Sequence, residues 1–180
     1  ISGDSDGLLT ITGGEVIPGK LEGTNFTGSL LVGHSTTGTL TEAYRNVGVG
    51  IGSLDAITRG DDNTALGYNS AGSITTGSSN TAIGNEAMLS GTGGEANSAL
   101  GYQALKVVTG NNNVGIGTLS GRNLTSSSGS VIIGAVEADS TTADRQLKIA
   151  GNDGSTTTTW ISGDSDGLLT ITGGEVIPGK

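Results

Sequence analysis

The sequence predicts an all-β protein, a parallel β-solenoid (β-roll) of seven coils of about 17 residues each. Three observations lead to this prediction. Glycine preceded by Val, Ile or Leu recurs at a nearly constant spacing, large and small side chains alternate just before it, and Gly, Ser, Thr, Asn and Asp dominate the remainder. Because one such coil cannot bury an apolar face alone, coils with this period are expected to stack on one another.

The repeating glycine sets the register of the coils. Its positions are separated by 17, 17, 17, 17, 16 and 17 residues, at Gly33, Gly50, Gly67, Gly84, Gly101, Gly117 and Gly134. Glycine at this point suits a positive φ angle or the close approach of the next coil. Each coil begins four residues earlier with Asn or Ser, whose short side chain is expected to bond its own backbone at a corner.

Two apolar columns are expected to line the coils. The residue before the glycine is always aliphatic, and in five of seven coils the residue before that is Ala or Gly, which predicts a strand with one large and one small face. We expect the large face to fill the coil. A second strand is expected seven residues after the glycine, at an aliphatic position held by Leu40, Ile57, Ile74, Val108 and Leu124, and by Gly91 and Thr141 in the other two coils.

A threonine column follows the second apolar column. It predicts a ladder of stacked side chains at Thr41, Thr58, Thr75, Thr92, Thr109, Thr125 and Thr142. The single one-residue deletion lies between Thr109 and Asn113, where a polar turn should absorb the change in length.

A longer repeat encloses the short one. Residues 1–20 recur unchanged as residues 161–180, a period of 160, which predicts a tandem array of long modules. Residues 1–28 are then a connector, 29–146 the β-roll, and 147–180 a connector that contains the start of the next module. Alternating apolar residues predict strands at Leu147 and Ile149 and at Leu169 and Ile171. Trp160, at the junction, is expected to plug the end of a stack.

Composition excludes several classes of function. The net charge is −9 and the 8 basic residues form no patch, so no nucleic-acid partner is expected. One His and no Cys leave no catalytic triad and no His-based metal site, so the chain is expected to be neither an enzyme nor cofactor-dependent. No apolar stretch approaches the roughly 18 residues of a membrane span, and no membrane insertion is expected.

The remaining site candidates are weak. Asp4 and Asp6, repeated as Asp164 and Asp166, have calcium-loop spacing without the other ligands, so an ordinary turn is favoured over calcium. The tripeptide at residues 59–61 resembles a cell-attachment sequence, but a solvated corner is favoured. Tyr68 and Tyr102 could form an aromatic stripe for sugars, although simple covering of the coil is favoured.

The motifs at residues 63–68, 80–85 and 97–105 resemble head repeats of trimeric autotransporter adhesins and of related phage tail-fibre proteins. The resemblance covers about residues 29–146. It implies a left-handed β-roll in an intertwined homotrimer that projects from a cell or virion surface and contacts host ligands. The coil of about 17 residues is longer than the adhesin repeat. On physical grounds too we expect a homotrimer, which would bury the small Ala and Gly face.

These observations predict a structural module in the shaft of a long extracellular fibre, with the chain itself and its adjacent modules as partners. A glycan-binding adhesin head is the first alternative, with a host surface ligand as partner. An ice-binding solenoid, suggested by the threonine column, is the second.

Overall fold

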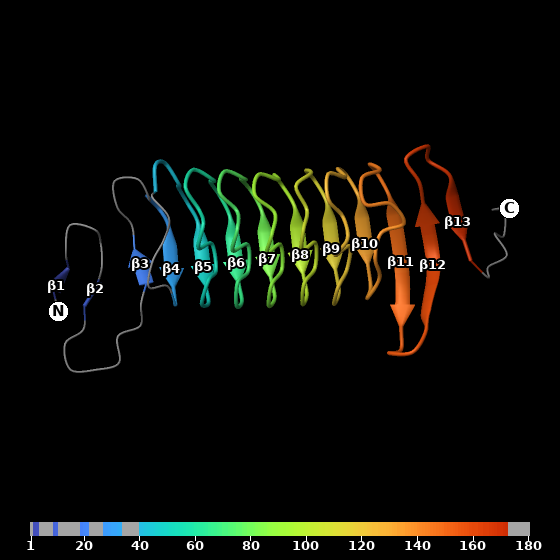
Figure 1. Ribbon diagram of the computed structural model, residues 1–180, viewed down its shortest axis with the longest axis horizontal. Coiled ribbons are helices and arrows are strands. Elements are labelled where there is room, and N and C mark those ends of the chain that lie inside the picture. The colour runs from blue at the N-terminus through green and yellow to red at the C-terminus, as the bar shows by residue number, and fades with distance from the viewer. Residues whose placement is uncertain (1, 4–8, 11–18, 22–26, 34–39, 173–180) are drawn as a thin grey trace, which may run out of the picture.

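The computed structural model describes residues 2–3, 9–10, 19–21, 27–33 and 40–172. All regular secondary structure in these residues is β, and the prediction of a parallel β-solenoid with coils of about 17 residues is confirmed. Eleven strands, β3 to β13, form one sheet along the long axis of the molecule (Figure 1). The sheet is the wall that all coils share.

The central strands are short and strictly in register. Each pairs in parallel with the strand one coil later, as Thr64 and Ala65 of β6 do with Thr81 and Ala82 of β7. Their bounds are Leu30–Val32 (β4), Val47–Val49 (β5), Thr64–Leu66 (β6), Thr81–Ile83 (β7), Ser98–Leu100 (β8), Val114–Ile116 (β9) and Val131–Ile133 (β10).

Antiparallel strands flank this parallel block, in agreement with the strands predicted in the connectors. At one end β3 (Gly19–Leu21) pairs with β4, and β1 (Ser2–Gly3) forms a separate two-stranded sheet with β2 (Leu9–Thr10). At the other end β11 (Leu147–Asn152) still pairs in parallel with β10, so the parallel ladder continues past residue 146. β12 (Thr157–Gly163) and β13 (Leu169–Ile171) then follow in antiparallel order.

The predicted orientation of the strands is wrong. The middle residue of each strand points into the coil and the aliphatic residue after it points outward. In β5 to β9 this middle residue is small, and Ala65 and Ala99 are 1% exposed, whereas in β4 and β10 it is Leu31 and Ile132. The reason is that the coil is narrow and already filled: a Cβ atom on Gly115 would lie 2.7 Å from Leu105 Cγ, and one on Gly48 2.4 Å from Leu31 Cδ2. A partner chain is therefore not needed to bury the Ala and Gly face.

The predicted second strand is also wrong. Within residues 40–146 each coil has one strand, and Ile57, Ile74, Val108 and Leu124 are buried core residues in turns. Each of these residues closes its turn by donating its backbone N–H to the carbonyl of a second core position three residues earlier, as Ile74 N does to Ala71 O at 3.2 Å. That position, which the sequence analysis missed, is left-handed at its non-glycine members: Leu54, Ala71, Met88 and Leu105.

The asparagine that opens each coil forms a buried ladder rather than a local corner. Asn80 Nδ2 donates to Gly94 O at 2.8 Å across its own coil and to Asn63 Oδ1 at 3.1 Å in the preceding coil. Asn80 Oδ1 in turn accepts the Asn97 backbone N–H at 3.0 Å. The ladder links Asn46, Asn63, Asn80, Asn97 and Asn113 and ends at Ser29 and Ser130. Among the described residues, every buried side-chain nitrogen and oxygen has a partner.

The threonine ladder forms, with one correction. Backbone bonds run from Thr41 to Thr58, from Thr58 to Thr75 and from Thr75 to Thr92, as predicted. In the last coil Thr125 N donates to Thr141 O at 2.8 Å, so Thr141 takes the place expected for Thr142. The cause is a second one-residue deletion, in the turn after Gly134, which also moves Val136 opposite Gly121. The deletion predicted between Thr109 and Asn113 is confirmed by the in-register bonds on either side.

Trp160 does not plug the stack. Its side chain is 52% exposed on β12, and its ring lies over Gly151 of β11, where a Cβ atom would come within 2.5 Å of it. In the part of the chain that the structure describes, no helix has the length and apolar character to span a membrane.

Lowering the pH is expected to destabilise the solenoid through its bonded carboxylates. Lys106 Nζ and Gln103 Nε2 donate to Glu86 Oε2 and hold the pKa of Glu86 below its ordinary range, and Arg45 does the same for the pKa of Asp62. A carboxylate with a lowered folded-state pKa stabilises the fold above its unfolded pKa, and this contribution is lost as the pH falls through the folded value.

We therefore expect the thermal midpoint to hold above about pH 5 and to fall below about pH 4. A pH series of melting curves, followed by circular dichroism, measures it. Glu86→Gln removes one of the titrating groups and should show a smaller fall than the parent chain. A midpoint that stays constant or rises between pH 4 and pH 2 would contradict the expectation.

Candidate interaction surface

The outward aliphatic residues form a continuous apolar stripe along the sheet. They follow one another in register on adjacent strands, and we call them the apolar stripe: Val32, Val49, Leu66, Ile83, Leu100, Ile116 and Ile133. Leu66 and Leu100 are each 49% exposed. Seven coils at about 4.8 Å per strand make the stripe about 30 Å long. Contiguous exposed apolar surface of this kind marks a site of association more often than an isolated exposed residue does.

A second exposed column runs beside the apolar stripe, two residues further along each coil. It contains Ile51, at 69% the most exposed of these residues, and the predicted aromatic residues Tyr68 and Tyr102, both about half exposed. Between the two columns the chain turns at the repeated glycine, where φ is +136° at Gly67 and +137° at Gly101. The glycines therefore place the two columns side by side on one face.

The face next to these columns carries a bonded pair of charges. Glu86 accepts Lys106 Nζ at 2.9 Å and Gln103 Nε2 at 2.7 Å, and the Glu86 and Lys106 side chains are about one-quarter exposed. Because the charges neutralise one another in adjacent coils, they do not oppose burial of the neighbouring apolar stripe as an unpaired charge would.

The tripeptide Arg59-Gly60-Asp61 is built into the stack of coils. Gly60 is buried, and a Cβ atom on it would lie 2.2 Å from Gly77 O. Asp61 Oδ1 accepts the Tyr44 backbone N–H at 2.7 Å, and Asp61 N donates to Ser78 Oγ at 3.0 Å. The tripeptide therefore forms a corner that bonds to the neighbouring coils, which agrees with its interpretation as a structural corner rather than a cell-attachment sequence.

The predicted acidic pair forms a capped turn in its described copy. Asp164 Oδ1 accepts the backbone N–H groups of Asp166 and Leu168, each at 3.0 Å. Asp4 and Asp6 lie outside the described residues. Within residues 2–3, 9–10, 19–21, 27–33 and 40–172, no three His, Asp or Glu side chains are grouped so as to hold a metal ion. The turn interpretation has direct support, and calcium binding stays a prediction.

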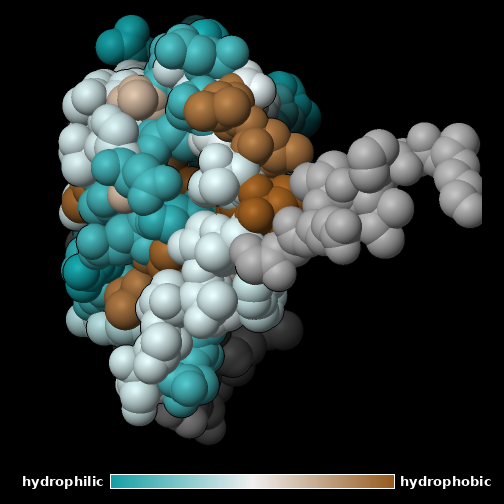
Figure 2. Space-filling view, turned by 90° about the vertical axis from the view of Figure 1, so that its right-hand side faces the viewer, coloured by the Kyte–Doolittle hydropathy of each residue, from teal (hydrophilic) through white to brown (hydrophobic). Residues whose placement is uncertain are grey.

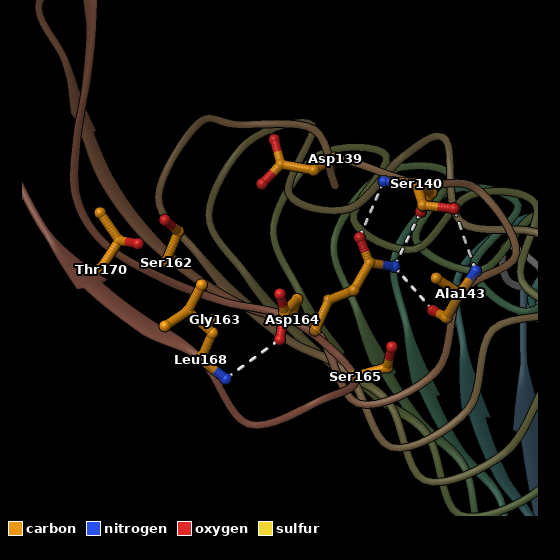
Figure 3. A pocket seen from close by; sticks show the side chains of 10 residues that line it. Asp139, Ser140, Ala143, Ser162, Gly163, Asp164, Ser165, Leu168 and Thr170 are labelled. Carbon is orange, nitrogen blue, oxygen red and sulfur yellow. Dashed lines mark hydrogen bonds between the residues drawn. The ribbon is translucent and has the colours of Figure 1, made fainter.

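A pocket of about 230 Å³ lies beside this turn, between the last coil and the β12–β13 hairpin (Figure 3). On the coil side, Gln146 donates to Ser140 O at 2.8 Å and to Ala143 O at 2.7 Å and accepts Ser140 N at 2.8 Å. On the hairpin side stand Asp164 and Leu168. Gln146, Ser140 and Ala143 are thus bonded to one another, as expected of a structural joint.

A comparison of the chain with protein-family models, with curated proteins and with solved structures gives no match. The surfaces of the chain itself therefore carry the functional assignment. Of the sites considered from sequence, the structure exposes the tyrosines and uses the repeated glycines and threonines in stacking. The apolar stripe is the surface that sequence reasoning placed inside the coil.

Proposed function

We propose that the chain is a structural module of a long extracellular fibre, and that its copies associate side by side through the apolar stripe. The observation that supports the proposal most directly is the exposure of an aliphatic side chain at the same place in successive coils, with Leu66 and Leu100 half exposed on the outer face of the sheet. A rigid module with such a stripe suits the shaft of a filament, because both features repeat along one axis.

A homotrimer is the assembly we favour. Three stripes facing a common axis would bury all the outward aliphatic side chains together, whereas the core of each coil is already complete within one chain. The proposal places the fibre on a cell or virion surface. It needs no cofactor and no catalytic activity.

Placing charge on the stripe is expected to separate the copies without unfolding them. In the double variant Leu66→Glu with Leu100→Glu, two half-exposed side chains become carboxylates that association would have to bury, and self-association should weaken by about 100-fold or more. Sedimentation equilibrium measures the mass, which should fall from three times 17.6 kDa to 17.6 kDa.

The matched control is Ser126→Glu, which adds a carboxylate at an exposed turn position away from the stripe and should leave the mass unchanged. Circular dichroism checks that all variants keep their β-structure. A parent chain that is monomeric at micromolar concentration would contradict association through the stripe.

Ligand binding is a second candidate function, favoured by one specific observation. Tyr68 and Tyr102 stand half exposed in a column with Ile51, so their rings are available for stacking on sugars. Saturable binding on a glycan array that is lost in Tyr68→Ala with Tyr102→Ala would favour an adhesin. The ice-binding alternative has less support, since the hydroxyls of Thr58, Thr75, Thr109 and Thr125 already donate to carbonyls of the next coil.

A further inference from the structure

The described residues of the identical segments 1–20 and 161–180 include a hairpin pairing that has the same register in both copies. In the first copy Ser2 pairs with Thr10 and Gly3 with Leu9. In the second, Ser162 pairs with Thr170 and Gly163 with Leu169, which is the same register shifted by 160 residues. The hairpin that ends the sheet, β12–β13, is therefore the counterpart of the hairpin β1–β2 that precedes β3.

The second copy of the hairpin is anchored to the solenoid. Residues ahead of it extend its first strand into β12, which pairs with β11 along most of its length. Arg145 Nη2 donates to Ser165 O at 3.1 Å and holds the turn of the hairpin against the last coil, beside the pocket in Figure 3. The hairpin is thus a fixed continuation of the sheet.

The outer edge of β13 is set up to bind another strand. Thr172 N donates to Trp160 O at 3.0 Å and Asp164 N to Leu168 O at 3.2 Å. Because backbone groups alternate in direction along a strand, those of Leu169 and Ile171 then point away from β12. Leu168, Leu169 and Ile171 are exposed, and Figure 2 shows apolar side chains gathered on this end of the molecule.

The outer edge of β3 has matching geometry. Leu30 N donates to Asn46 O at 2.7 Å and Gly50 N to Val32 O at 2.9 Å, both on the β5 side. Leu31 therefore faces β3 and bonds its register partner Lys20, which leaves the backbone groups of Gly19 and Leu21 pointing away from β4. Figure 1 shows β1, β2, β3 and β4 following one another along the long axis; in this chain β1 and β2 form a sheet of their own, and β2 lies next to β3 without ladder pairing.

We infer that successive modules of the array join through this hairpin, with the β3 strand of the following module pairing antiparallel to β13. The inference rests on the proposed function and specifies how the fibre continues. In this register Leu169 lies opposite Leu21 of the following module, and Ile171 lies opposite its Gly19. The outward-pointing backbone groups of the two strands then hydrogen-bond to each other. Exposed apolar side chains at the end of the sheet are covered at the same time, which removes an edge prone to uncontrolled pairing.

Two consequences follow for the whole filament. The strands β11, β12, β13, the next β3 and the next β4 alternate in direction, so the parallel blocks of successive modules all run the same way. One module contributes the eleven strands β3 to β13, and at about 4.8 Å per strand its axial length is about 53 Å.

The first test compares arrays of one, two and three modules by small-angle X-ray scattering. The maximum dimension should grow by about 53 Å for each module added, whatever the number of chains side by side. Growth by a clearly different length, or a spread of bent shapes, would overturn the continuous sheet and leave the fibre proposal standing. Arrays that do not lengthen at all would overturn both.

The second test traps the junction with a disulfide in a chain that has no native Cys. In a two-module array, Leu169→Cys of the first module and Leu21→Cys of the second should cross-link on mild oxidation, since paired Cα atoms lie about 5.5 Å apart. Thr170→Cys with the same partner is the control, because its side chain points to the opposite face and should not cross-link. Equal cross-linking of both pairs, or none with Leu169→Cys, would refute this register.

Discussion

Replacing Gly84, one of the repeated glycines, with alanine is expected to destabilise the solenoid strongly. Gly84 has a φ of +133°, outside the range that L-residues adopt at low cost, and a Cβ atom there would lie 2.4 Å from Gly101 O in the next coil. The carbonyl cannot retreat, since Gly101 is held by its own N–H bond to Ile83 O at 2.8 Å. Backbone strain and the steric clash together should lower the free energy of unfolding by about 3 to 6 kcal/mol.

Gly93→Ala is the matched control, at a glycine of the same coil that lies away from the clash. A Cβ atom on Gly93 has one neighbour within 4 Å, Thr76 Oγ1 at 3.6 Å, and the residue does not have the left-handed φ of Gly84. Its substitution should change the free energy of unfolding by no more than about 1 kcal/mol in either direction. Urea denaturation followed by circular dichroism measures both variants. Similar denaturation midpoints for the two would mean that the repeated glycine tolerates a side chain.

The periodicity of the chain could be predicted because stacking imposes it on every coil. The repeated glycine touches the backbone of the next coil, as Gly84 does Gly101, so any larger residue is excluded and the spacing is visible in sequence. The threonine column was predicted for the same reason, and the strands β11 and β13 were predicted from the alternation of their apolar residues. The shift from Thr142 to Thr141 was not, because a second deletion in the turn after Gly134 leaves no mark on the glycine spacing before it.

Which face of each strand points into the coil could not be predicted from alternation, because alternation shows two faces without saying which one is inside. The decisive quantity is the width of the coil. The core position four residues after the glycine is filled by Leu54, Ala71, Met88 and Leu105, and its variable size and left-handed backbone hide it from a hydrophobic pattern. Once those side chains occupy the interior, Ala or Gly must face them and the larger aliphatic residues must face outward. The candidate interaction surface follows from this.

Disrupting the buried asparagine ladder is the other change with a large expected effect. Asn80 is 1% exposed, and Asn80→Ala removes the donors to Asn63 Oδ1 and Gly94 O together with the acceptor of the Asn97 backbone N–H. Asn63 and Asn97 keep other bonds, but the buried Gly94 carbonyl and Asn97 N–H lose theirs. We expect the free energy of unfolding to fall by about 3 to 5 kcal/mol. Asn85→Ala, an exposed position in the same coil, is the control and should cost less than about 0.5 kcal/mol.

Asn80→Asp separates hydrogen bonding from the loss of volume. It keeps the shape of the side chain and the oxygen that accepts the Asn97 backbone N–H, but it replaces the donor with an oxygen. At neutral pH a buried carboxylate would face Asn63 Oδ1 and Gly94 O, so the variant should be at least as unstable as Asn80→Ala. These contacts raise the folded-state pKa of the new carboxyl group, so protonation stabilises the variant as the pH falls. Its deficit relative to the parent chain at the same pH should therefore shrink as the pH falls from the raised folded-state pKa to about pH 4, the unfolded pKa of Asp, because the protonated acid regains one donor. A deficit that is independent of pH would mean that packing, and not the ladder of hydrogen bonds, is what Asn80 contributes.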